Sequence, residues 1–370
     1  MSQMPQRAFS SPAAHHTVCA IVPPFLLARI ATLDDPRFER AATAARRSLT
    51  DVAHENLDHG RSKNTLPPRT LLPDEPSVRG EITRAISDAR GTETLPGILV
   101  REEGAPATND VAATEAYDGL GHTFALFWEV FQRDSIDDRS ATLEATVHFG
   151  NLYDNAFWDG KRMVFGDGDG EIFDSFTRSL SVIGHELAHG VTEYTAGLVY
   201  RDQSGALNEH VSDVFGALVE QYARGTTAAD ASWLVGEGIF TDEVEGTALR
   251  SLKAPGTAYD DDVLGKDPQP GHMDDYIVTQ DDNGGVHLNS GIPNRAFWSV
   301  ADTLGGFAWQ QAGQIWYDTL TGGSLTPHST FAEFSAATIE TALALFGEDS
   351  AEHRAVISGW ALVGVVPAAA

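Results

Sequence analysis

The stretch that decides the fold is Ser181-Val182-Ile183-Gly184-His185-Glu186-Leu187-Ala188-His189-Gly190, which carries the pattern His-Glu-x-x-His. Apolar residues recur around it at helical spacing and predict a helix over about 177–194. Residues four apart lie on one face of a helix, so His185 and His189 can offer their imidazoles to one ion. Two nitrogen ligands with a Glu between them favour zinc held for hydrolysis. Alone, the pattern is only moderately specific, because three of its five positions are fixed.

A third ligand is expected further along the chain. Glu209 follows His189 by twenty residues, within a second predicted helix, and it lies off that helix's apolar stripe. The stripe consists of Leu207, Val211, Val214, Phe215, Leu218, Val219 and Tyr222. Glu209 can complete a set of two histidines and one glutamate. Asp213, one turn later, can accept the distal N–H of a liganding imidazole. For Glu209 alone, a solvent-exposed helix acid is the alternative.

The chemistry also needs a base and groups that stabilise negative charge. Glu186 stands beside the expected metal and suits a general base acting on zinc-bound water. Tyr200 and His287 are candidate donors to the oxyanion, and Asp282 could orient His287 and raise its pKa. Spacing alone does not place Tyr200 or His287, which as single residues would more often be ordinary polar groups.

Composition limits the partners and the compartment. The 370 residues leave room for two domains, and the single cysteine excludes an intrachain disulfide. The formal charge of −28 argues against nucleic acid or an anionic membrane as a partner. No apolar run reaches the length of a membrane span, and the run 18–30 lacks the features of a secretory signal. No export signal is therefore visible in the sequence, and a cytoplasmic location is the alternative to secretion.

The first part of the chain differs in charge from the rest. Residues 1–63 contain eight Lys or Arg and six acids, 8 − 6 = +2, which leaves −28 − 2 = −30 for the remainder. A basic leader could dock on an acidic body, and a separate tail is the alternative. We expect disorder over 1–17, an apolar extended piece over 19–27 and a helix over about 36–57. The proline-rich range 60–78 has linker composition and is an expected cleavage region.

The rest of the chain predicts a β-rich part followed by a helical part. A helix is expected over 111–131 and strands at 145–149 and 163–165. Further helices are expected at about 292–304, 308–321, 330–346 and 350–363, with a loop-rich range at 241–283. The run Gly166–Gly170 is interpreted as a tight turn rather than a calcium loop, because Arg178 stands where an EF-hand needs Glu.

The sequence resembles the thermolysin family of zinc metallopeptidases. The matching runs fall in order over roughly 100–365: Asn155–Trp158, Met163–Gly170, His185–Gly197, Ser204–Glu209, Asp213 and Asn283–Gly291. The resemblance implies an α+β fold of two lobes, with the zinc helix at their junction. The expected boundaries are 71–194 for the β-rich lobe and 195–370 for the helical lobe. The implied activity is cleavage of internal peptide bonds on the amino side of bulky hydrophobic residues. The resemblance also implies that the protein is secreted.

The resemblance also implies a role for particular residues. One catalytic zinc would be held by His185, His189 and Glu209, with Asp213 behind a ligand. Glu186 would be the base, Tyr200 and His287 would stabilise the oxyanion, and Asp282 would support His287. Asn155 and Ala156 match an edge strand that pairs with the substrate backbone, and Arg250 matches the arginine that binds the substrate carbonyl. The implied primed-side pocket consists of Phe173, Phe176, Val182, Val235, Ile239 and Leu249, for each of which a plain core role is the alternative.

Two features depart from the thermolysin pattern. Ser181, Ser232 and Gly238 stand where the family's double calcium site has acids, whereas Glu220 and Glu237 remain, so any calcium site is weakened. The loop from Arg250 to His287 is also longer than usual.

The leader instead resembles the short propeptide of the protealysin-like subgroup, whose mark here is Pro23-Pro24-Phe25-Leu26-Leu27. This implies that residues 1–70 form an intramolecular inhibitor and linker, removed by self-cleavage from a chain that acts as a monomer on protein and peptide substrates. Cys19 could ligate the zinc of the precursor, and a small buried or exposed thiol is the alternative.

Three other functions stay open at this point. A catalytically silent peptide-binding relative is disfavoured because every catalytic position is filled. A precursor locked by its leader could instead bind a partner protein without catalysis. An aminopeptidase could use the same zinc pattern, but no acidic motif for a substrate amino terminus is recognisable.

Overall fold

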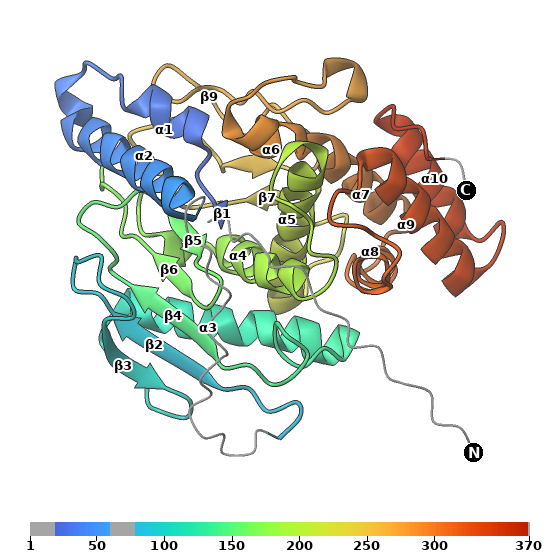
Figure 1. Ribbon diagram of the computed structural model, residues 1–370, viewed down its shortest axis with the longest axis horizontal. Helices are drawn as coiled ribbons and strands as arrows, with labels where there is room; N and C mark the ends of the chain where they lie inside the picture. Colours follow the sequence, from blue (N-terminus) through green and yellow to red (C-terminus); the bar gives the residue numbers. More distant parts are fainter. Residues whose placement is uncertain (1–18, 60–77, 369–370) are drawn as a thin grey trace.

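The computed structural model describes residues 19–59 and 78–368 (Figure 1). The predicted disorder over 1–17 and nearly all of the predicted linker 60–78 lie outside these residues. Among the helices described, none is long and apolar enough to cross a membrane.

A six-stranded mixed sheet forms the core of the N-terminal lobe. Its strands are β1 (Cys19–Ala20), β2 (Arg84–Asp88), β3 (Ile98–Glu102), β4 (Leu143–Val147), β5 (Ala156–Trp158) and β6 (Met163–Phe165), in the order β1-β5-β6-β4-β2-β3. Strands β2, β4 and β6 are parallel neighbours, and the other pairs are antiparallel. Helix α3 (Val111–Ala125), continued by a π-helical turn (Leu126–Val130), packs against this sheet. The strand expected at 163–165 and the helix over 111–131 are confirmed, whereas the strand expected at 145–149 begins two residues earlier and ends at Val147.

The leader is part of this sheet and then becomes helical. After β1 come α1 (Pro24–Ile30), a 3₁₀ turn (Pro36–Phe38) and α2 (Glu39–His59), which confirms the helix expected over 36–57. The expectation of an extended chain over 19–27 is wrong beyond Pro23. Pro24 occupies the first helical position, where its missing N–H costs no hydrogen bond and its fixed φ suits the helix. Leu26, Leu27 and Ile30 are thereby buried.

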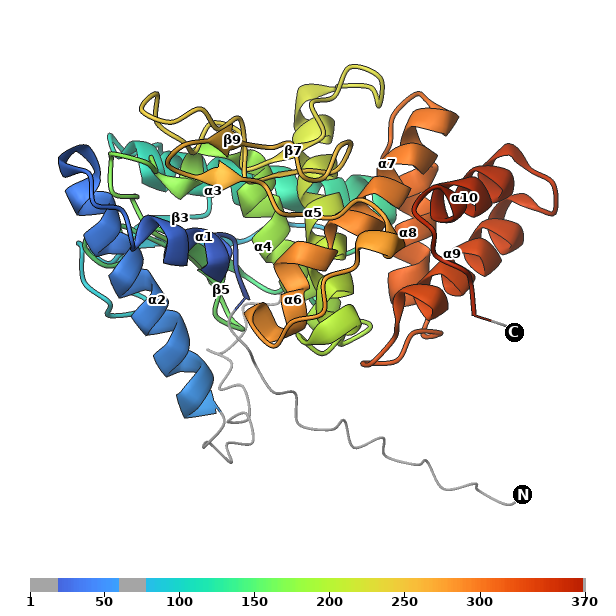
Figure 2. The same ribbon diagram turned by 90° about the horizontal axis from the view of Figure 1, so that it is seen from above.

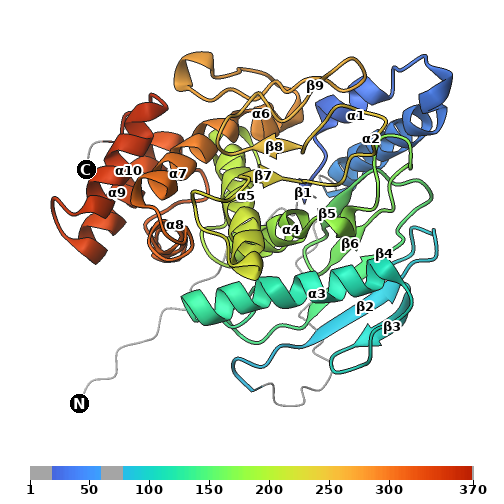
Figure 3. The same ribbon diagram turned by 180° about the vertical axis from the view of Figure 1, so that it is seen from behind.

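Two helices meet at the centre of the molecule (Figure 3). Helix α4 (Leu180–Glu193) carries the His-Glu-x-x-His pattern, and α5 (Asp202–Arg224) carries Glu209. Gly216 allows their close approach, because a Cβ there would lie 2.4 Å from the carbonyl oxygen of Ser181. Residues 181–192 of α4 are all buried, as expected for a helix with protein on every side.

The C-terminal lobe is mainly helical (Figure 2). Its helices are α6 (Asp282–Asn289), α7 (Gly291–Leu304), α8 (Ala312–Thr321), α9 (Phe331–Phe346) and α10 (Ala351–Leu362). The four helices expected after residue 290 are confirmed, and Thr330 with Glu333 forms the expected capping box of α9. Before the start of α6, the loop-rich range 241–283 contains β8 (Arg250–Ser251), which pairs with the preceding β7 (Leu234–Val235), the short pair β9 (Asp260–Asp261) with β10 (Gly265–Lys266), and a 3₁₀ turn (Met273–Asp275).

The α+β architecture of two lobes with the zinc helix between them is therefore confirmed. The run Gly166–Gly170 forms a turn closed by Asp169, whose side chain accepts the backbone N–H groups of Glu171 and Ile172 at 2.6 and 2.7 Å. This matches the interpretation of that run as a tight turn.

Candidate active site

Three buried side chains converge where α4 and α5 touch. The Nε2 atoms of His185 and His189 lie 3.0 Å apart, and the carboxylate of Glu209 lies 3.6 Å from the first and 3.4 Å from the second. Among the described residues these three form the one group of His, Cys, Asp and Glu whose ligand atoms all lie within 4.8 Å of each other. The structure thus brings together the three residues expected to hold a metal.

The outer nitrogens of both histidines are already occupied. His185 Nδ1 lies 2.8 Å from Asp213 Oδ1, and His189 Nδ1 lies 2.7 Å from Asn208 Oδ1. Asn208 also donates to the carbonyl of Leu198, which fixes its amide so that the oxygen faces the histidine. The Nε2 lone pairs therefore face each other, and Glu209 Oε2 has no hydrogen-bond partner among the described residues. This donor set fits a zinc ion.

Asn208 is a supporting residue that the sequence reasoning did not single out. Its only signal was its position directly before Glu209.

Asp213 has more partners than the sequence predicted. It makes a two-point ion pair with Arg250 at 2.9 Å and accepts from Asn294 at 2.8 Å. Burial alone would raise the pKa of Asp213, but the Arg250 guanidinium lowers it to about 2. Asp213 is therefore a buried anion shared by a metal-facing histidine and an arginine.

Glu186 lies on α4 between the two histidines and is fully buried. Its Oε2 accepts the backbone N–H of Trp158 at 3.1 Å, whereas Oε1 has no partner among the described residues. Burial, followed by the nearby charge of Glu209, raises the pKa of Glu186 well above its usual value. The carboxyl is thus anchored by one oxygen and free to act through the other.

The start of α6 positions His287. Gly284 and Gly285 have φ of +89° and +77°, a left-handed turn that most other residues avoid. The turn folds Asp282 back, so that its carboxylate accepts the backbone N–H of His287 at 2.9 Å and lies 2.6 Å from His287 Nδ1. Burial would lower the pKa of His287, but Asp282 and then Glu209 raise it to about 9. This contact with Asp282 is the one expected from the sequence, and it favours the protonated form of His287.

The hydroxyl of Tyr200 contacts both His287 and Glu209, one of the three expected metal ligands. It donates to Glu209 Oε1 and lies 3.2 Å from His287 Nε2. The structure therefore places both expected oxyanion donors beside the expected metal ligands, although 87 residues separate Tyr200 from His287 along the chain.

The leader lies across this group of residues. Strand β1 pairs antiparallel with β5, with Ala20 opposite Phe157. Ile21 donates its N–H to the carbonyl of Ala156 at 3.0 Å and accepts from Arg250 Nη1 at 3.0 Å. Asn155 accepts the N–H of Val22 at 2.9 Å. The three residues expected to bind a substrate backbone therefore bind the leader instead.

The residues expected to form the primed-side pocket are all buried in the main hydrophobic core, as Ile21 is: Phe173, Phe176, Val182, Val235, Ile239 and Leu249. Phe173 stacks on Phe240 with ring centres 5.3 Å apart and is tilted against Phe176 with ring centres 5.6 Å apart. Cys19 is buried beside Tyr200 and Val286. Burial and then the charge of Glu209 raise the pKa of Cys19 well above its usual value.

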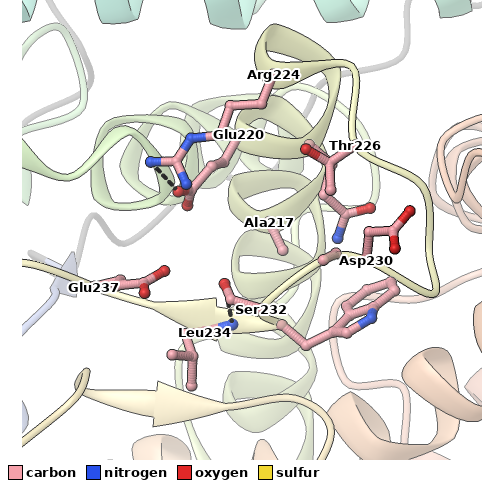
Figure 4. Close-up of a pocket in the computed structure, with 11 residues that line it drawn as sticks. Ala217, Glu220, Arg224, Thr226, Asp230, Ser232, Leu234 and Glu237 are labelled. Carbon is pink, nitrogen blue, oxygen red and sulfur yellow. Dashed lines mark hydrogen bonds and ion pairs between the residues drawn. The ribbon is translucent and has the colours of Figure 1, made fainter.

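A separate pocket of about 210 Å³ lies where the resemblance places the double calcium site. Glu220 and Glu237 line it together with Asp230 and Ser232. Figure 4 shows Arg224 turned back onto Glu220, with Nη2 2.7 Å from the carboxylate. Ser181 lies next to this pocket: its hydroxyl accepts the backbone N–H of Gly236 and is hydrogen-bonded to Glu220.

Comparisons with known proteins agree with this geometry. Residues 76–193 match the profile of the thermolysin metallopeptidase catalytic domain, and residues 196–365 match that of its alpha-helical domain. The chain is 47% identical over 350 residues to an extracellular metalloprotease of Pectobacterium carotovorum subsp. carotovorum, covering 94% of this chain and 96% of that protein. It is 51% identical over 294 residues to protease PrtS of Photorhabdus sp. (strain Az29), covering 79% of each.

A solved structure shows the same fold. The precursor of protealysin, a metalloproteinase from Serratia proteamaculans, aligns with a TM-score of 0.84 and 47% identity over 94% of this chain and all of that one. Thermolysin-like sequence, fold and metal-binding residues therefore agree, and the chain belongs to the thermolysin family of metallopeptidases as a zinc-dependent metalloendopeptidase.

Proposed function

We propose that His185, His189 and Glu209 hold the catalytic zinc, with Asp213 and Asn208 fixing the two imidazoles. The facing Nε2 atoms and the unpartnered oxygen of Glu209 support this assignment. When bound, zinc polarises the substrate carbonyl and lowers the pKa of water. In this site Glu186 would take a proton from the attacking water and pass it to the leaving nitrogen. Its anchored but half-unpartnered carboxyl suits that transfer.

Tyr200 and His287 would donate to the oxygen on which negative charge develops, with Asp282 keeping His287 protonated. The support is that His287 Nε2 already lies 3.0 Å from a peptide carbonyl, that of Ala20. A donor held in this position before reaction needs no reorganisation when the charge appears.

Replacing Asp282 by Asn is expected to shift the pH profile of kcat/KM. His287 donates only while protonated, and Asp282 raises its pKa to about 9, so activity should fall as the pH rises through that range. Without the carboxylate the pKa of His287 drops, and the alkaline loss of activity should begin at lower pH. Profiles of both proteins, measured on one peptide, test this. An unchanged alkaline limb would contradict the role of Asp282.

The same site should accept internal peptide bonds and select a bulky apolar residue after the cut. Asn155, Ala156 and Arg250 would bind the substrate backbone, and the six pocket residues would bind the side chain. The observation that carries this proposal is the leader, which passes through the site with chain on both sides of Ala20. This favours an endopeptidase over an aminopeptidase. Peptides blocked at both ends should be cut before Leu or Ile and not before Asp; refusal of all blocked peptides would contradict it.

We further propose that residues 1–70 are a self-processed leader that inhibits the chain, and that the body divides at residues 194 and 195. Family profiles that begin at 76 and 196 support these boundaries. Arg29 supports docking, because it donates to the carbonyls of Val263 and Asp262 in the long loop of the body. Secretion is proposed from the extracellular relative, and a monomeric state from a site completed within one chain.

Calcium binding in the pocket beside α5 is proposed to be weak, because the Arg224 guanidinium already neutralises Glu220. The Glu186→Gln chain is used for this measurement because it should not digest itself. Calcium at about 5 mM should raise its Tm only slightly, since the stabilisation follows RT ln(1 + [Ca²⁺]/Kd) and Kd is large. A matched variant, Arg224→Ala with Ser232→Asp, removes the competing cation and restores an acid. It should gain a calcium-dependent rise in Tm. A large rise in the parent chain would overturn the proposal.

A further inference from the structure

The leader contacts the site at two successive carbonyl groups, and each contact has a distinct chemical meaning. The carbonyl of Ala20 accepts from His287 Nε2 at 3.0 Å, where the proposed function places the oxyanion donor. The carbonyl of Ile21 accepts from Arg250 Nη1 at 3.0 Å, where it places the group that binds the residue after the cut. These two contacts define both the direction and the register of the leader.

Two further contacts agree with that register. The N–H of Ile21 donates to Ala156 O, and Val22 is held on both sides by the Asn155 amide, with its N–H at 2.9 Å and its carbonyl at 3.4 Å. Every backbone polar group from the Ala20 carbonyl to the Val22 carbonyl thus has a partner. The segment therefore lies as an extended substrate would, antiparallel to β5.

We propose that the Ala20–Ile21 peptide bond occupies the reaction position and is the first bond that the chain cuts in itself. This inference rests on the proposed endopeptidase function and deepens it by naming the bond. Hydrolysis adds one water across the bond: its oxygen joins the Ala20 carbonyl carbon, the C–N bond breaks, and Glu186 transfers a proton to the nitrogen of Ile21. The products are a carboxylate at Ala20 and an amine at Ile21.

The side chains fit this assignment. Ile21 is 0% exposed and lies in the main hydrophobic core, as Val182, Val235 and Leu249 do, so a large, buried aliphatic side chain directly follows the bond. Ala20, before the bond, is small and packs in a different cluster with Phe157. The leader thus places a bulky apolar residue directly after the bond, which is the residue type that the site is expected to prefer there.

The contacts also predict which product remains bound. Arg250, Asn155 and the long loop reached by Arg29 all hold residues after the cut. The product that begins at Ile21 keeps all of these contacts and is therefore expected still to cover the primed side after the cut.

The test uses the full-length chain, purified with a chelator and started by adding zinc. Intact mass and peptide mapping at the earliest time points should show a fragment ending at Ala20 and a new amino terminus at Ile21. The rate should not depend on protein concentration, because the bond is cut within one molecule. The Glu186→Gln chain should stay intact. In that uncut chain the amide hydrogens of Ile21 and Val22 should exchange slowly, which reports the register without turnover.

Matched variants separate this inference from the function on which it rests. Ile21→Asp places a charge in an apolar pocket and should slow this cut at least about tenfold, whereas Ile21→Leu should stay within about threefold. An earliest cut elsewhere, or an equal rate for Ile21→Asp, would overturn the inference. Casein hydrolysis by the processed samples tests the proposed endopeptidase function separately. If the samples hydrolyse casein while the Ala20–Ile21 bond stays intact, the inference about this bond is refuted and the proposed function is not.

Discussion

Glu186→Gln is expected to lower kcat by about 10²- to 10⁴-fold while the chain still binds one zinc ion. Glutamine keeps the size of the side chain and can still meet the backbone of Trp158, but it cannot take a proton from water. The metal-facing atoms belong to His185, His189 and Glu209, so zinc binding should survive. Zinc content by elemental analysis and kcat on a blocked peptide are the two measurements.

Glu193→Gln is the matched control for this prediction. It makes the same chemical change on α4, two turns further on, where the carboxylate accepts the indole N–H of Trp158 and does not belong to the metal-binding group. Its kcat should stay within about twofold of the parent. Near-normal kcat for Glu186→Gln would remove Glu186 from the role of base, and loss of zinc would mean that it supports the metal instead.

Arg250→Leu should cause the largest loss of stability. The variant leaves Asp213, which is fully buried, without the guanidinium that balances its charge. Removing one partner of a buried ion pair typically costs about 3–5 kcal/mol, because the remaining charge is uncompensated. Urea unfolding, followed in the Glu186→Gln background to prevent self-digestion, should show a clearly lower midpoint.

A second substitution isolates the cause of that loss. Adding Asp213→Asn to Arg250→Leu removes the orphaned charge, so part of the stability should return, although His185 loses its carboxylate partner. A midpoint for Arg250→Leu equal to that of the parent would show that Asp213 does not need the arginine. No recovery in the double variant would show that the loss comes from packing rather than from charge.

The sequence predicted the parts of the site that depend on local spacing. His185 and His189 are four residues apart on one helix, so their proximity follows from helix geometry alone. Glu209 was placed by its position off the apolar stripe of α5, and Gly216 then lets the two helices meet. Tyr200 and His287 could be named only through family resemblance, because the loops that bring them together have no periodic signal.

The position of the leader was not predictable from local patterns. Pro23 and Pro24 suggested an extended chain, but Pro24 begins a helix because the first turn needs no N–H from it. The binding of Ala20, Ile21 and Val22 depends on contacts more than 130 residues away in the chain. Asn208 was missed for a similar reason, since an amide gains its role only when its oxygen meets His189.

The dependence of internal peptide cleavage on bound zinc is the most direct test of an endopeptidase site formed by His185, His189 and Glu209. Zinc-free processed enzyme should not cut a peptide blocked at both ends and containing one Ala–Leu bond. Activity should rise in proportion to added zinc and reach its plateau at one ion per chain, with cleavage between Ala and Leu. Full cleavage by zinc-free enzyme, or a plateau far from one ion per chain, would contradict this site.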